Sequence, residues 1–148
     1  MTTRCPGCAV ELEALDGPAH PYLGASPACW ALYGELLLRR PGQLAVDAYA
    51  VQHPGLPERR SIQSVALHLL TLCLFLEAGH DPKHGPRLHR RLIERLPEPH
   101  WLEPPEPNGT VTVADVLGGV SVETWARDVW AAWSPHHATV RAWLAASL

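Results

Sequence analysis

The sequence predicts an all-α fold, a helical bundle of about four main helices plus short ones, with an irregular N-terminal loop. Three observations lead to this prediction. Apolar residues recur at helical spacing in several segments. A Ser-Pro pair, which suits a helix start, occurs at residues 26–27 and again at 134–135. The strand-like run 110–113 has no second strand with which to pair.

The length of 148 residues fits one domain, which we expect to span residues 1–148. Shifts in composition divide it into four parts. These are a zinc-knuckle loop (1–25), a helical core (26–96), a Pro-rich loop (97–111) and C-terminal helices (112–148).

The N-terminal loop is rich in turn-forming residues and shows no periodicity. The first helix, residues 27–39, starts where Ser26 can cap it and Pro27 occupies its first position. A second helix follows at 44–52 and stops before Pro54 and Gly55. The first 25 residues contain few apolar side chains, so we expect another interaction to attach them to these helices.

The third helix, residues 62–78, is apolar on almost every face, which predicts a place in the middle of the bundle. We expect Ser61 to cap its start and Gly79 to close its end. A fourth helix follows at 84–96. Five prolines then exclude a helix interior from residues 97–109. The remaining helices are predicted at 112–117, 122–133 and 134–146, with Thr112 and Ser121 as caps.

Charge and hydropathy exclude two classes of partner. The 15 acidic residues outnumber the 12 Lys and Arg residues, so the formal charge is −3 and argues against nucleic-acid binding. No apolar run reaches the ~20 residues of a membrane span. The N-terminus lacks the apolar stretch of a signal peptide, so we expect a cytoplasmic protein.

Cysteine usage points to a metal. Cytoplasmic thiols stay reduced, so the four cysteines are expected to bind metal or to be buried rather than to form disulfides. Cys5 and Cys8, with Pro and Gly between them, have the spacing of a zinc half-site. A redox pair or two free thiols are the alternatives, and the redox pair is disfavoured because no strand precedes Cys5.

A closed zinc site needs two further ligands. Cys29, in the first turn of the first helix, is the third candidate, although it can also be a small buried core residue. The spacing leaves His20 and His53 open as the fourth. Our hypothesis is Zn2+ held by Cys5, Cys8, Cys29 and His53, which would attach the N-terminal loop to two helices.

These motifs resemble an uncharacterised bacterial protein family of unknown function. Its members show a Cys-Pro-x-Cys knuckle, a cysteine at a helix start and a Tyr-x-x-Gln-His-Pro helix end. The matching positions here are Cys5, Cys8, Cys29, Tyr49, Gln52 and His53. Some relatives carry a cysteine where this chain has Ala48. The resemblance covers about residues 5–75 and implies a metal site, but no activity.

A histidine in the apolar third helix raises an enzymatic alternative. A buried imidazole must be hydrogen-bonded or bind a ligand, and we expect His68 to bond a serine or a backbone carbonyl. Alternatively, His53, His68 and His137 could form an open metal site of a hydrolase, with Tyr49 near it. Asp47 can act as the partner that holds a ligating histidine ring. Five histidines are expected on the surface or in loops: His80, His84, His89, His100 and His136.

The favoured functional hypothesis is a non-enzymatic interaction or regulatory module with a mainly structural metal. A stripe of tryptophans in the C-terminal helices is expected to be core, or the face of a homodimer or protein partner. This stripe comprises Trp125, Trp130, Trp133 and Trp143. No motif for a nucleotide-binding loop or a serine nucleophile occurs.

Overall fold

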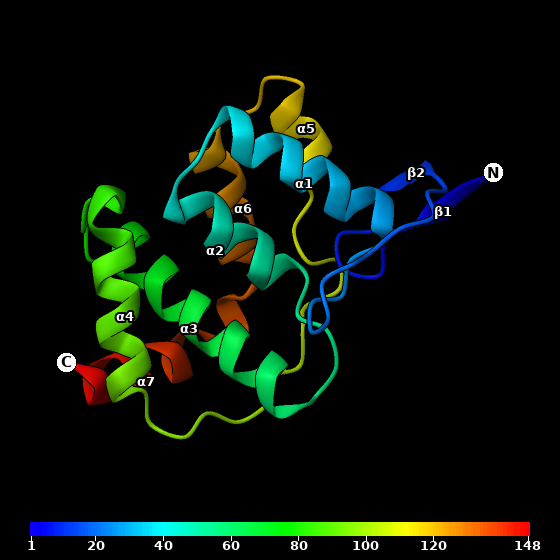
Figure 1. Ribbon diagram of the computed structural model, residues 1–148. Helices are drawn as coiled ribbons and strands as arrows, with labels where there is room; N and C mark the ends of the chain where they lie inside the picture. The colour runs from blue at the N-terminus through cyan, green and yellow to red at the C-terminus, as the bar shows by residue number, and fades with distance from the viewer.

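The computed structural model covers residues 1–148 and is mostly helical, which confirms the predicted fold class (Figure 1). Two short 3-10 turns, Pro82–His84 and Ser134–His136, precede α4 and α7. The α-helices are α1 (Pro27–Arg39), α2 (Gln43–Gln52), α3 (Arg59–Leu76), α4 (Gly85–Arg95), α5 (Val113–Leu117), α6 (Val122–Ala132) and α7 (His137–Ser147).

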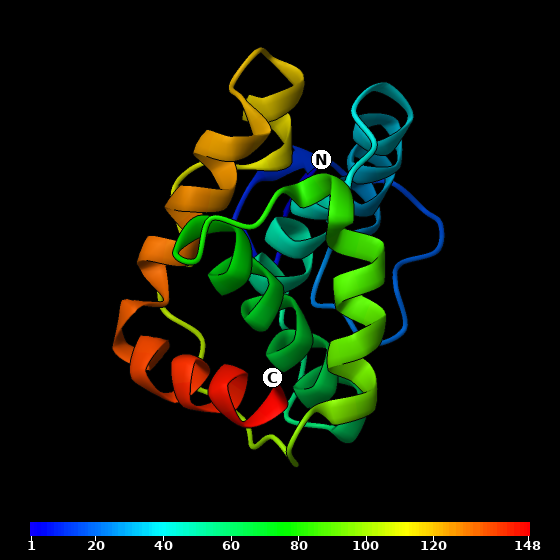
Figure 2. The same cartoon turned by 90° about the vertical axis from the view of Figure 1, so that its left-hand side faces the viewer.

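Helix α3 lies at the centre of the bundle, as its apolar sequence predicts. Twelve of its eighteen residues are buried. It packs against α2, α4, α6 and α7, and Figure 2 shows α4 running alongside it. A helix with neighbours on most sides needs apolar side chains on most faces. No helix of the structure combines the length and the apolar character needed to cross a membrane.

Most predicted helix starts are correct because short-range side-chain bonds determine them. The Ser26 hydroxyl accepts a hydrogen bond from the Cys29 amide at 3.2 Å, and Ser121 caps α6 in the same way. The prediction for Ser61 is wrong. Helix α3 begins earlier, with Glu58 in the cap position, and the Ser61 hydroxyl instead donates to the Tyr22 carbonyl at 2.8 Å.

The N-terminal segment is more regular than predicted. Strands β1 (Thr2–Arg4) and β2 (Glu11–Glu13) pair antiparallel, with Thr3 opposite Leu12. The connection between them carries both knuckle cysteines and is closed by a bond from the Cys5 amide to the Val10 carbonyl at 2.9 Å. This hairpin lies beside the start of α1 (Figure 1). The strands are short and mostly exposed, so the sequence carries little apolar alternation to reveal them.

The tryptophan stripe lies in the core. Trp125 and Trp133 are fully buried, and Trp130 and Trp143 are at most 9% exposed. Their rings therefore pack within the chain, and a partner that docks on the C-terminal helices would contact other side chains.

Candidate metal centre

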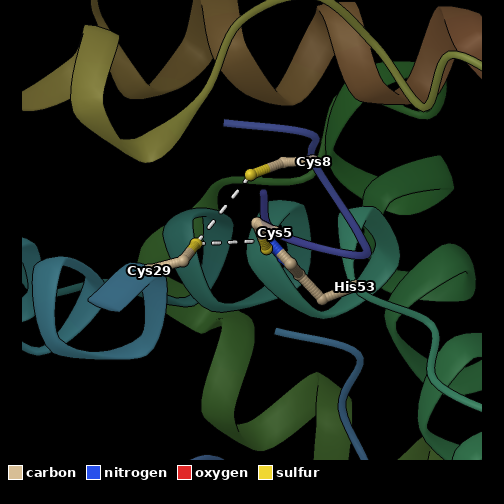
Figure 3. Close-up of side chains that lie close together, drawn as sticks. All are labelled: Cys5, Cys8, Cys29 and His53. Carbon is tan, nitrogen blue, oxygen red and sulfur yellow. Dashed lines mark hydrogen bonds between the residues drawn. The ribbon is translucent and has the colours of Figure 1, made fainter. Parts of the chain in front are cut away.

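The structure brings Cys5, Cys8, Cys29 and His53 together at the junction of the hairpin with two helices (Figure 3). Cys5 and Cys8 come from the β1–β2 connection, Cys29 from the first turn of α1 and His53 from the C-terminal end of α2. Their ligand atoms all lie within 4.8 Å of one another. Four residues of the predicted site thus form one cluster, and this cluster could hold a metal ion.

The spacing of the donor atoms fits a tetrahedral ion. Zn–S bonds of ~2.3 Å and Zn–N bonds of ~2.05 Å at tetrahedral angles place two sulfurs ~3.8 Å apart, and a sulfur and a nitrogen ~3.6 Å apart. The Cys8 and Cys29 sulfurs are separated by 3.9 Å. The Cys29 sulfur and His53 Nε2 are separated by 3.5 Å. These two separations therefore match a tetrahedral ion, and the other donor pairs lie within 4.8 Å.

Gly7 allows the knuckle to approach the end of α2. A Cβ atom on Gly7 would lie 2.4 Å from Cδ2 of His53, 2.7 Å from the Gly24 carbonyl oxygen and 2.8 Å from that of Gln52. No side chain fits in this space. The glycine between the two cysteines is thus required by close backbone packing.

A hydrogen bond to the backbone of α2 fixes the orientation of the His53 ring. Its Nδ1 lies 2.7 Å from the Tyr49 carbonyl, so Nδ1 carries the proton and donates, leaving the Nε2 lone pair to face the sulfurs. The Tyr49 ring stacks on the His53 ring at 4.0 Å, and its hydroxyl lies 3.3 Å from the Cys29 sulfur. His20 is elsewhere: its Nδ1 accepts a bond from the Tyr22 amide. The structure thus places His53, and not His20, in the cluster.

The three thiols influence one another strongly. Hydrogen bonds from Cys29 and Cys8 lower the pKa of Cys5 far below its usual range. The pKa of Cys29 is raised, mainly by its hydrogen bond with Cys5 and to a smaller extent by its hydrogen bond with Cys8. Without a cation, one thiolate is therefore stabilised by neighbours that stay protonated. A divalent cation supplies the positive charge that allows all three to ionise.

Comparison with known proteins gives one match, to a protein family. A family model described as a family of unknown function, DUF5946, matches residues 3–134. The chain belongs to this family. The match extends well beyond the N-terminal half that carries the knuckle and the Tyr-x-x-Gln-His-Pro motif. No significant match occurs among the curated proteins or the solved structures.

Gln52, one of the positions on which the resemblance to this family rests, anchors the end of α2 next to His53. Its side-chain amide is fully buried, donates to the carbonyls of Asn108 and Val111, and accepts a bond from the Trp125 indole at 3.0 Å. Asn108 in turn donates to Val51 and accepts from the Trp133 indole. The network ties the end of α2 to the Pro-rich loop and to α6. The sequence does not indicate that Asn108 is buried, because an Asn before a Gly is typical of an exposed turn.

In this member of the DUF5946 family, His53, His68 and His137 do not form one site. His53 belongs to the cysteine cluster. His137 stacks on Trp130 at 3.8 Å, and its Nε2 lies 2.8 Å from the Trp130 carbonyl. The prediction of a three-histidine site is therefore wrong, because the three helix positions face different neighbours.

The expected partner of His68 is also wrong. Its Nδ1 lies 2.7 Å from Oδ1 of Asp47, rather than from a serine or a backbone carbonyl. Asp47 is fully buried on α2 and does hold a histidine ring, as one interpretation of the sequence suggested.

Proposed function

We propose that Cys5, Cys8, Cys29 and His53 bind Zn2+ and that this ion has a structural role. The observation that carries the proposal is the match between the donor spacing and a tetrahedral ion of three sulfurs and one nitrogen. Thiolate and imidazole donors are the ligands of structural zinc sites.

The arrangement is closed. Four protein donors complete a tetrahedral shell, so no coordination position is left for a substrate or an activated water. Cys5, Cys29 and His53 are at most 1% exposed. Three thiolates also reduce the Lewis acidity of the ion. These features support structural zinc over a catalytic metal at this cluster.

The ion would crosslink three separate parts of the chain. It would join the hairpin connection to α1 and α2, whereas the hairpin itself contributes few buried apolar side chains. Because the unfolded chain does not present a formed site, the binding free energy contributes several kcal/mol to the stability of this region.

The biological role that this arrangement favours is an interaction or regulatory module of the cytoplasm. The closed shell of the cysteine cluster supports a structural rather than a catalytic role for the ion held there. The separation of His53, His68 and His137 removes the geometry on which the alternative hydrolase depended. Contact with a second copy or another protein through the C-terminal helices stays a prediction.

The test is the zinc content of purified full-length protein, measured by mass spectrometry under non-denaturing conditions, for wild type and Cys8→Ser. The matched control is Cys73→Ser, because Cys73 is buried outside the cluster and contacts Glu77. We expect Cys8→Ser to lose one zinc per chain and to melt at a lower temperature, and the control to keep that zinc. Unchanged zinc content and melting temperature in Cys8→Ser would refute the proposal.

A further inference from the structure

A second cluster of metal-binding side chains lies where three helices meet. Asp47 comes from α2, His68 from α3 and His89 from α4, and their ligand atoms lie within 4.8 Å of one another. The His68 and His89 rings stack with centroids 5.0 Å apart. The surface position expected for His89 is wrong, because its helix lies against α3 (Figure 2) and the ring is half-buried.

Two buried atoms of this cluster lack a hydrogen-bond partner. They are Oδ2 of Asp47 and Nδ1 of His89, the only two such side-chain atoms in the chain. Oδ1 of Asp47 is satisfied, since it receives bonds from His68 and from Gln43 at 2.9 Å. A buried polar atom without a partner destabilises a protein, and one ligand shared by both atoms would remove that cost.

An ion pair between Asp47 and His68 does not account for this arrangement. That pair uses Oδ1 of Asp47, so Oδ2 of Asp47 and Nδ1 of His89 still lack a hydrogen-bond partner. A cation between the three side chains would satisfy the free carboxylate oxygen and a ring nitrogen of His89 together.

Two imidazoles and a carboxylate are hard-to-borderline donors that bind Zn2+, Fe2+ or Co2+. Three protein ligands leave at least one coordination position open. Both histidines line a surface pocket of about 270 Å3, whose wall also includes Arg60, Gln63 and Ser64. The pocket gives water or a small oxygen-containing ligand access to that position.

We infer that Asp47, His68 and His89 form a second, open site for a divalent transition metal. It differs from the cysteine cluster in donor type and in access to solvent. The inference does not depend on zinc at the cysteine cluster, because the two groups share no residue.

The experiment titrates full-length protein, loaded with one equivalent of zinc, with Co2+ by calorimetry and visible absorption. Co2+ at the cysteine cluster would give sulfur-to-cobalt charge-transfer bands, so Co2+ bound without those bands reports on the second site. We expect one Co2+ per chain, with weak ligand-field bands and without sulfur-to-cobalt charge-transfer bands. Binding should weaken at least ~10-fold in Asp47→Asn, which keeps the shape of the side chain.

His89→Leu is the second variant. It replaces an unpartnered ring by an apolar group, so we expect the apo protein to melt at the same or a higher temperature and to bind no Co2+ at this site. The matched control, His84→Ala, removes an exposed histidine next to α4 and should bind Co2+ as wild type does. No Co2+ uptake by the zinc-loaded wild type, or equal uptake by His89→Leu, would overturn the inference.

Discussion

Replacing Gly7 with alanine tests whether close packing of the knuckle maintains the metal cluster. The added methyl group would meet Cδ2 of His53 at 2.4 Å and the carbonyl oxygens of Gly24 and Gln52 at 2.7 and 2.8 Å. Comfortable carbon–carbon contacts are ~3.5–4.0 Å, so the overlap with the His53 ring is about 1 Å. Two of the three atoms belong to the backbone, and the chain itself must move.

The magnitude follows from this overlap. Forcing a methyl group into a packed site costs about 1–3 kcal/mol, and the backbone contacts place Gly7→Ala in the upper part of that range. At ~2–4 °C per kcal/mol for a chain of about this size, a loss of ~2.5 kcal/mol lowers the melting temperature by ~5–10 °C. Displacement of His53 should also weaken zinc binding about 10-fold or more.

Differential scanning calorimetry and competition with a zinc chelator measure the two effects. The control is Gly17→Ala in the same N-terminal segment, where a Cβ atom meets nothing within 4 Å. It should match wild type in both assays. If Gly7→Ala melts and binds zinc as wild type does, the packing argument for the knuckle is refuted.

Three further predictions concern the Asn108 network, an ion pair at the end of α3 and the local effect of the metal. Asn108→Ala leaves the Trp133 indole and the Val51 carbonyl without hydrogen-bond partners. The free energy of unfolding, measured with urea, should therefore fall by about 2–4 kcal/mol. A change below about 0.5 kcal/mol would contradict the role of the network. Hydrogen bonds from Arg141 lower the pKa of Glu77 from its usual 4.5, so their contribution to stability is present above pH 4.5 and lost as the pH falls through the lowered value. Melting temperatures recorded from about pH 7 to about pH 3 should therefore fall more steeply for wild type than for Glu77→Gln, and parallel curves would refute this. Removal of metal by a chelator should speed amide hydrogen exchange in the hairpin but not in α3, and uniform acceleration would contradict a local role for the ion.

Much of the fold could be predicted because local signals determine it. The start of α1 follows from Ser26, whose hydroxyl caps the helix, and from Pro27 at its first position. The central place of α3 follows from its apolar composition. The start of α3 could not be predicted in this way, because the Ser61 hydroxyl donates to the carbonyl of Tyr22, which is 39 residues earlier in the chain.

The candidate sites also depend partly on local sequence patterns and partly on contacts between distant parts of the chain. The spacing of Cys5 and Cys8 is a local pattern, so it could be recognised directly. The choice of His53 over His20 depends on how the end of α2 meets the hairpin, and spacing left it open. His89 precedes two arginines in a helix rich in charged residues, so its sequence neighbours indicate a surface position. Only the packing of α4 against α3 shows that it lies next to His68.

The central claim, a zinc ion held by three cysteines and one histidine, is tested most directly by X-ray absorption at the zinc edge. The sample is full-length protein loaded with one equivalent of zinc. The structure predicts three sulfur neighbours at ~2.3 Å and one nitrogen neighbour at ~2.0–2.1 Å. A first shell made only of nitrogen and oxygen would contradict the account.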